Sequence, residues 1–177
     1  MAPYSIRIFG DPVLKQRAAE VTEIDGRLAR LAEDMLSTMY DAPGLGLAAP
    51  QVGVQKRLFT YDDHEDDDAN PRVIVNPVIV ETKGESVFEE GCLSIPGLHF
   101  EIVRPEFVTV QGLDLDGNEV VIEADERLSR IFQHEIDHLD GVLMLDRLEP
   151  DERKAALKVI REHDLAHAAR EAGVPRL

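Results

Sequence analysis

The chain has 177 residues, of which 44% are apolar and 31% charged, with 19 Lys and Arg against 35 Asp and Glu. A chain of this length normally forms one domain, and its core is large enough to fold without a disulfide or a structural metal. The composition excludes disordered and collagen-like chains, and the net charge of −16 argues against DNA as a partner, because phosphate neutralisation requires basic side chains.

Cys92 is the only cysteine, so no intrachain disulfide can form. This cysteine usage is typical of a reducing compartment. The first residues lack the basic segment and the apolar run of a secretory signal, and no stretch approaches the ~20 apolar residues of a membrane-spanning helix. We therefore expect a cytoplasmic protein with no membrane partner.

Apolar residues recur at helical spacing over Gly26–Tyr40, with Asp25 placed to cap the helix at its N-terminus. The acidic run Asp62–Asp68 is expected to be a solvated loop. Runs rich in β-branched residues then predict five strands, namely Arg57–Tyr61, Arg72–Val80, Leu98–Val103, Glu106–Asp114 and Asn118–Ala124. The last two strands flank Asp116-Gly117, a dipeptide that favours a tight hairpin turn.

Two further helices are expected in the C-terminal part of the chain. One covers Asp125–Asp140 and stops at Gly141, and the other runs from about Pro150 to Ala172. The strands cluster between helices and are joined by short turns. The sequence therefore predicts a single α+β domain over residues 1–177, with antiparallel or mixed sheets around the helix at 125–140 and with an N-terminal and a C-terminal helix.

The strongest chemical signal is the segment Gln133–Gly141, which contains the pattern H-E-x-x-H. At about 100° per residue, His134 and His138 lie only ~40° apart around the helix axis, so both imidazoles can reach one metal ion. Glu135 flanks this face, where a carboxylate can act as a general base without binding the metal. Apolar neighbours on both sides indicate a buried helix, in which two histidines and two acids require a reason.

A hydrolytic metal site uses three protein ligands and leaves one position open for water. Cys92, in the segment Glu89–Pro96, is the candidate for the third ligand. A small buried side chain and a catalytic Cys–His dyad are the other uses of a lone cysteine. The metal role is favoured because His134 and His138 already require another donor.

The third element is the glycine-rich segment Gly44–Gln51. It lacks the Lys and Ser/Thr of a phosphate-binding loop, and it follows a helix rather than a strand. What remains is a narrow backbone wall that ends in the amide donor Gln51. Such a wall suits a small carbonyl group whose developing oxyanion accepts a hydrogen bond.

Together these segments resemble the peptide deformylases. The family motifs G-x-G-x-A-A-x-Q, E-G-C-x-S and Q-H-E-x-D-H-x-x-G occur in this order at Gly44–Gln51, Glu90–Ser94 and Gln133–Gly141. The similarity covers residues 5 to about 165. The C-terminal helix is similar to that of the bacterial subtype with a helical tail.

The resemblance implies a metal-dependent hydrolase that removes the formyl group from the N-terminal methionine of nascent polypeptides and releases formate. By this resemblance Cys92, His134 and His138 bind one divalent metal, natively Fe²⁺, with Zn²⁺, Ni²⁺ or Co²⁺ as substitutes. Glu135 is implied as general base and later acid. The implied donors to the formyl oxygen are the Gln51 side chain and the Leu93 backbone N–H.

The resemblance also implies a substrate site and a partner. The implied substrate-binding residues are Gly44, Leu45, Gly46, Phe88 and Ile131. Position 99 is His where many relatives with a helical tail carry a longer basic side chain, whereas Arg104 matches the family. The tail of this subtype docks at the ribosome, and residues 151–177 here carry six basic and five acidic side chains. A helix that simply packs on the domain is the other interpretation of the tail.

Two other functions fit part of the pattern. An H-E-x-x-H peptidase that cleaves internal amide bonds would place its third ligand downstream of the helix, whereas Cys92 lies upstream. A metal-stapled binding module would need a closed site with four ligands, and the motifs offer no fourth donor.

Overall fold

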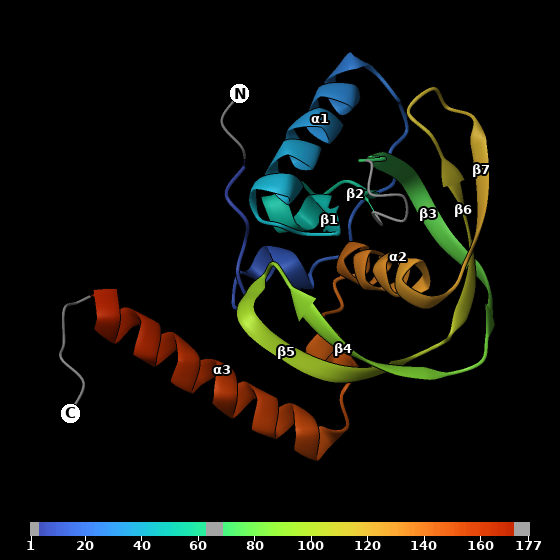
Figure 1. Ribbon diagram of the computed structural model, residues 1–177. Helices are drawn as coiled ribbons and strands as arrows, with labels where there is room; N and C mark the ends of the chain where they lie inside the picture. Colours follow the sequence, from blue (N-terminus) through green and yellow to red (C-terminus); the bar gives the residue numbers. More distant parts are fainter. Residues whose placement is uncertain (1–3, 63–68, 172–177) are drawn as a thin grey trace.

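The computed structural model describes residues 4–62 and 69–171 (Figure 1). Most of the predicted acidic loop, residues 63–68, lies outside the described residues. The expectation of a solvated loop is wrong for Asp62, which is buried and accepts a hydrogen bond from the Tyr40 hydroxyl at 2.6 Å. The described helices and strands are α1 (Gly26–Asp41), β1 (Gly46–Ala48), β2 (Leu58–Tyr61), β3 (Arg72–Lys83), β4 (Ser86–Cys92), β5 (Ile95–Arg104), β6 (Phe107–Leu113), β7 (Glu119–Ala124), α2 (Glu126–Leu139) and α3 (Pro150–Glu171). Three short 3₁₀ helices complete the set, η1 (Pro12–Lys15), η2 (Ala49–Val52) and η3 (Met144–Arg147).

The strands form two separate antiparallel sheets. The larger sheet has the order β1-β2-β3-β6-β7, and β4 and β5 form a two-stranded hairpin. Helix α2 lies between the larger sheet and this hairpin, and α3 runs along the outside of the hairpin (Figure 1). The predicted α+β class with antiparallel sheets around a central helix is therefore confirmed.

The three predicted helices are present within one or two residues of their expected ends. Asp25 caps α1 as predicted, because its carboxylate accepts hydrogen bonds from the backbone N–H groups of Arg27 and Leu28 at 3.0 and 2.9 Å. The apolar face of α1 is buried against the larger sheet. No helix among the described residues is long and apolar enough to cross a membrane.

Helix α2 is the centre of the core. Its residues from Ser129 to Leu139 are all buried, which confirms the expectation of a buried helix. Phe132 packs against the rings of Phe59 and Tyr61 on β2, with ring centroids 5.7 and 4.9 Å apart. Burial of these aromatic rings fixes α2 on the sheet, and it also fixes the direction in which the neighbouring polar side chains point.

The strand prediction omitted β1 and β4, and it began β5 three residues late at Leu98. Strand β1 has only three residues, so it offers almost no periodicity. Strand β4 carries the polar pair Glu89-Glu90 and is largely exposed, although Glu90 itself is buried. A buried charge inside a strand breaks the alternation of apolar and polar residues on which strand prediction depends.

Helix α2 begins with a strained residue. Glu126 has a φ of 40°, in the left-handed region that costs an L-residue roughly 1–2 kcal/mol. Glycine adopts this region without that cost. The strain lies at the entry to the helix that carries the histidines.

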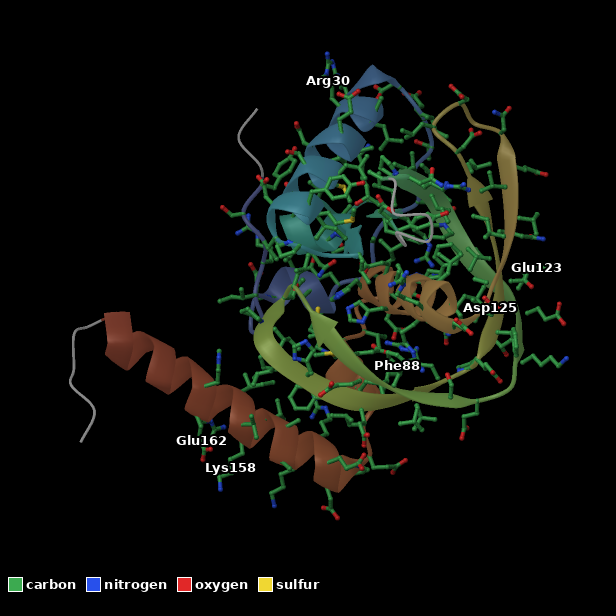
Figure 2. All side chains as sticks on the ribbon, viewed as in Figure 1. Arg30, Phe88, Glu123, Asp125, Lys158 and Glu162 are labelled. Atoms are coloured by element: carbon green, nitrogen blue, oxygen red, sulfur yellow. The ribbon has the colours of Figure 1, made fainter. Side chains whose placement is uncertain are left out.

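We predict that Glu126→Gly is more stable than Glu126→Ala by about 1 kcal/mol, because only glycine relieves the positive φ. This order is the reverse of the usual one inside a helix, where glycine is less stable than alanine by about 1 kcal/mol. Arg30, exposed on α1 (Figure 2), provides the matched control, and there the alanine variant should be the more stable. Urea unfolding of the four variants measures both differences. The same order at both positions would contradict the prediction.

Candidate metal centre and active site

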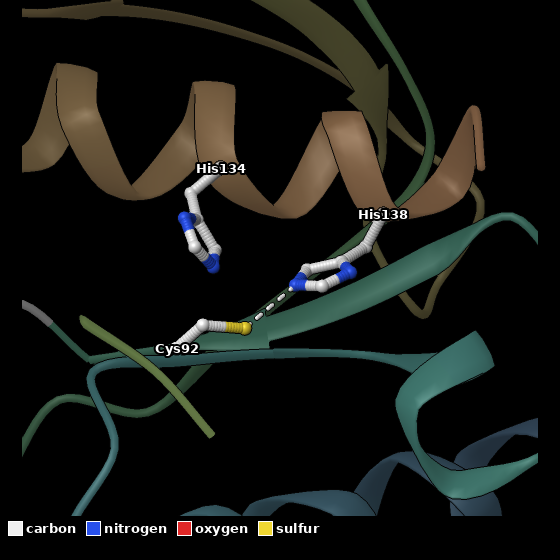
Figure 3. A group of neighbouring side chains, drawn as sticks. All are labelled: Cys92, His134 and His138. Carbon is white, nitrogen blue, oxygen red and sulfur yellow. Dashed lines mark hydrogen bonds between the residues drawn. The ribbon is translucent and has the colours of Figure 1, made fainter. Parts of the chain in front are cut away.

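Three potential metal ligands converge between α2 and the β4–β5 hairpin. His134 and His138 project from consecutive turns of α2, and Cys92 stands at the end of β4 (Figure 3). One donor atom from each residue lies within 4.8 Å of the other two, and no other such group is found among the described residues. The Cys92 sulfur lies 3.2 Å from Nε2 of His138. The structure thus brings together the three residues that the sequence selected.

The set of donors fits a divalent transition metal. Thiolate sulfur and imidazole nitrogen are ligands for Fe²⁺, Zn²⁺, Ni²⁺ and Co²⁺ rather than for Mg²⁺ or Ca²⁺. Three protein ligands leave a fourth position for water or substrate. The second ring nitrogen of His134 is bound to a carboxylate, which is the usual arrangement for a metal-binding histidine.

That carboxylate belongs to Glu90, which is only 5% exposed. It accepts a hydrogen bond from Nδ1 of His134 at 3.0 Å, and two from Arg104 at 2.6 and 3.0 Å. Arg130 donates a further hydrogen bond at 3.0 Å. Glu90 therefore connects β4, β5 and α2 and leaves Nε2 of His134 directed toward the Cys92 sulfur (Figure 3).

The electrostatics of this cluster follow from burial and pairing. Burial by itself would raise the pKa of Glu90, but the hydrogen bonds from His134 and Arg104 outweigh it and lower the pKa to about 2. Burial would lower the pKa of His134, yet the Cys92 sulfur and Glu90 raise it well above its ordinary value. Burial and the neighbouring His134 hold the pKa of His138 well below its ordinary value.

Glu135 is buried beside the three donors, with 4% of its surface exposed. Burial is the main reason that its pKa is raised to about 7, and its Oε2 atom has no hydrogen-bond partner. The backbone of β1 lies against this side chain. A Cβ atom at Gly46 would be only 2.5 Å from Oε1 of Glu135, so this close approach requires glycine.

A cavity of about 700 Å³ opens beside the donors. Gln51, Cys92, His134 and Glu135 all contribute to its wall, and so does Leu93. The five residues expected to bind substrate also line it, namely Gly44, Leu45, Gly46, Phe88 and Ile131. Every site residue selected from the sequence except His138 therefore faces one cavity, and His138 adjoins it through Cys92.

The two basic positions singled out in the sequence have different surroundings. His99 is exposed on the cavity wall and stacks over Gly91, where a Cβ atom would lie 2.8 Å from its Nε2. Arg104 is buried, with 3% of its surface exposed, and bonds Glu90 and Asp137. Arg104 therefore supports the protein framework rather than the cavity surface.

Three residues of the site were missed by the sequence analysis. Arg130 bonds Glu90, Asp137 links Arg104 to Arg147, and Ser94 accepts a hydrogen bond from Gln51. Ser94 and Asp137 belong to the motifs that contain Cys92 and His138, and their positions in these motifs could have indicated that they lie at the site. Arg130 carried none, because its spacing fits an ordinary solvent-exposed helical residue.

A buried H-E-x-x-H helix with a cysteine beside its histidines defines a candidate metallohydrolase site. Comparisons with known proteins assign the family. Residues 3–154 match the sequence model of the family described as polypeptide deformylase. Peptide deformylase 1 of Corynebacterium efficiens is 52% identical over 166 residues, covering 93% of this chain and 98% of that protein.

Further relatives agree with this match. The peptide deformylase of Acidothermus cellulolyticus is 45% identical over 166 residues, covering 94% of this chain and 90% of that protein. The crystal structure of a peptide deformylase from Legionella pneumophila superposes with a TM-score of 0.87 at 43% identity, covering 94% of this chain and 98% of that one. The chain belongs to the peptide deformylase family, which consists of metal-dependent enzymes that remove the N-formyl group from nascent peptides.

We predict that Glu90→Gln lowers the free energy of unfolding by about 3 kcal/mol at neutral pH, because buried Arg130 loses its counter-charge and buried Arg104 keeps only Asp137. A carboxylate whose folded pKa is lowered from 4.5 to about 2 stabilises the protein above pH 4.5, and this contribution is lost as the pH falls toward 2. The difference between wild type and variant should therefore shrink over that range. Urea unfolding of chelator-treated protein at several pH values measures it.

The neighbouring exposed residue provides the control for this experiment. Glu89→Gln changes the same charge one position away and should shift stability by no more than about 0.5 kcal/mol. Equal losses in both variants, or a pH-independent loss at position 90, would contradict the assignment.

Proposed function

We propose that this chain, acting as one catalytic domain over residues 1–177, hydrolyses the formyl group from the N-terminal methionine of newly synthesised polypeptides in the cytoplasm. The observation that carries the proposal is the convergence of Cys92, His134 and His138 beside a buried glutamate on the wall of one cavity. Membership of the peptide deformylase family supports it.

In this proposal Cys92, His134 and His138 hold one divalent metal, natively Fe²⁺, which Zn²⁺, Ni²⁺ or Co²⁺ can replace. The thiolate and imidazole donors suit all four ions. When bound, such an ion supplies Lewis acidity that lowers the pKa of water and polarises a carbonyl oxygen. Glu90 orients His134 toward the ion through the hydrogen bond to Nδ1.

The protein's own groups then handle the proton and the developing charge. Glu135 accepts a proton from the attacking water and returns it to the leaving amine, a role supported by its burial and its unpartnered Oε2 atom at the cavity. The Gln51 side chain and the Leu93 backbone N–H donate to the oxyanion that forms on the formyl oxygen. Formate and a free amino terminus are released.

The cavity wall suits a formyl-methionyl end. Leu45, Phe88 and Ile131 offer apolar contacts for the methionine side chain. Gly44 and Gly46 contribute backbone rather than side chains to the same wall. A side chain would not fit at Gly44, where a Cβ would lie only 2.7 Å from the Leu93 side chain. Backbone of this kind can pair with an extended peptide.

The alternative functions are less well supported. Family membership favours deformylation over cleavage of internal amide bonds. The 3.2 Å contact between Cys92 and His138 also fits a Cys–His dyad, but a dyad leaves Nε2 of His134 without a role. A closed four-ligand structural site would need another His, Cys or carboxylate donor, and the part of the chain that the structure describes places none with these three.

We predict that Glu135→Ala is folded and retains stoichiometric metal but releases formate from a formyl-methionyl peptide at least about 10²-fold more slowly, because proton transfer by a positioned side chain contributes about that much. Formate release and elemental analysis measure the two properties. Glu89→Ala, which removes an exposed carboxylate from the same cavity, should stay close to wild type.

Two results would overturn this function. Substantial formate release by Glu135→Ala would assign the base to another group. Cleavage of an unformylated peptide by the wild-type enzyme, without formate release, would favour the internal peptidase.

We further propose that α3 contacts the ribosome. Helix α3 buries Ala156 and Ile160 against the body of the protein, whereas Lys154, Lys158 and Arg161 are exposed. Figure 1 shows α3 extending past the hairpin, away from the rest of the fold. Asp151, Glu152 and Glu162 are exposed on the same helix, and Glu162 pairs with Lys158 at 3.8 Å. The three basic side chains are still the part of an otherwise acidic protein that a phosphate-rich surface would attract.

Deletion of residues 166–177 and, separately, the double change Lys154→Glu and Lys158→Glu should each weaken ribosome co-sedimentation severalfold, and more so at low salt. Formate release from a free peptide should stay unchanged. The double change Arg27→Glu and Arg30→Glu alters the charge by the same amount at two exposed positions of α1 and is the matched control. Undiminished co-sedimentation of both tail variants would remove α3 from this role.

A further inference from the structure

Gln51 and Leu93, the two proposed oxyanion donors, lie on elements far apart in the sequence. Gln51 belongs to η2 after β1, and Leu93 lies in the tight Leu93-Ser94 turn that joins β4 to β5, where Cys92 pairs with Ile95. A tetrahedral oxyanion needs both donors in one fixed geometry. The fold must therefore hold η2 and this turn in a fixed position relative to each other.

The orientation of the Gln51 amide is unambiguous in this structure. Its Oε1 atom accepts a hydrogen bond from the backbone N–H of Ala48 at 2.8 Å. Because a backbone N–H can only donate, the oxygen must face Ala48 and the –NH₂ group must face the hairpin turn. There Nε2 donates to the hydroxyl oxygen of Ser94 at 3.2 Å.

The two amide hydrogens of Gln51 have different acceptors, and only one of these acceptors is strong. An –NH₂ group has two N–H bonds, and Ser94 accepts one of them. The other donates a long hydrogen bond to the Cys92 sulfur on the cavity wall, with 3.8 Å between Nε2 and the sulfur, and it is the hydrogen that a bound formyl oxygen would take over. Both side chains are almost fully buried, with 1% of Gln51 and none of Ser94 exposed, so the hydrogen bond between them is shielded from solvent.

Backbone hydrogen bonds also connect Gln51 with Ser94, through a third segment of the chain. In the segment before η1, the N–H of Arg7 donates to the carbonyl of Gln51 and the N–H of Phe9 donates to the carbonyl of Ser94, each at 2.7 Å. One short piece of chain thus anchors the two residues whose side chains bond each other. The hydroxyl of Ser94 adds the one contact that fixes the amide itself.

We propose that Ser94 is a positioning residue that aligns the Gln51 amide with the Leu93 backbone N–H. The hydroxyl holds one amide hydrogen and thereby aims the other at the cavity, while the turn that carries Ser94 also carries Leu93. Ser94 acts through Gln51 and does not itself touch substrate. This inference rests on the proposed role of Gln51.

The test is a double-mutant cycle on enzyme reconstituted with one divalent metal, assayed by formate release. Gln51→Leu should lower kcat by about 10²–10³-fold, the effect of removing one oxyanion donor. Ser94→Ala should lower kcat by about ten- to a hundredfold with little change in KM, because the donor is present but misaligned. In the Gln51→Leu background, Ser94→Ala should have no further effect on kcat. Metal content should stay stoichiometric in all three variants.

Ser129→Ala is the matched control for the loss of a buried hydroxyl. Ser129 is 1% exposed and its hydroxyl also accepts a hydrogen bond from a glutamine, Nε2 of Gln133 at 2.9 Å. Its kcat should equal that of wild type. If Ser94→Ala does not fold, Ser94→Thr and Ser94→Val provide a pair of equal shape, and the threonine variant should have the higher kcat.

A readout independent of activity is the NMR signal of the Gln51 side-chain amide, assigned by its loss in Gln51→Leu. Its protons should exchange with solvent faster in Ser94→Ala than in wild type or Ser129→Ala. An unchanged kcat or unchanged amide exchange in Ser94→Ala, or an additive effect in the double variant, overturns the positioning role alone. An unimpaired Gln51→Leu overturns the proposed role of Gln51 and the inference with it.

Discussion

The buried carboxylate of Glu90 is the interaction on which the site depends. It accepts four hydrogen bonds from Arg104, Arg130 and His134, and these donors come from β5 and α2. Removing one member of such a cluster leaves an uncompensated buried charge, which costs several kcal/mol. Glu90 lies two residues before Cys92, so the contact that attaches the hairpin to α2 also sets the position of the cysteine. The geometry of the three candidate ligands and the attachment of the hairpin therefore depend on one set of contacts.

Other contacts hold the remaining elements in place around the cavity. Three separate pieces of chain meet at the cavity, namely α2 with the histidines and Glu135, the hairpin with Cys92 and Leu93, and η2 with Gln51. Aromatic packing fixes α2 on the sheet. The segment before η1 joins η2 to the hairpin, and glycine at position 46 lets β1 approach Glu135. Each of these contacts has at least one buried member, namely Phe132, Gln51 or Glu135.

Much of this arrangement could be predicted from the sequence, and the reason differs from element to element. The helix at 125–140 followed from helical periodicity and from the spacing of His134 and His138, both of which are local properties. The need for a third donor then selected Cys92, the only cysteine, and the resemblance to the peptide deformylases implied the same set of ligands. Strand β4 and the partners of Glu90 were missed, because the fit between a buried acid and two distant arginines depends on the tertiary structure. The hydrogen bond between Gln51 and Ser94 joins residues 43 positions apart, so no local pattern records it.

The central claim is that one sulfur and two ring nitrogens of this chain bind the same ion. X-ray absorption spectroscopy of the cobalt-substituted protein, combined with elemental analysis, tests it most directly. The account predicts one ion per chain, with one sulfur and two nitrogen neighbours at normal metal–ligand distances, and loss of the sulfur signal in Cys92→Ala. A bound ion with no sulfur neighbour, or a sulfur signal that survives Cys92→Ala, would contradict it.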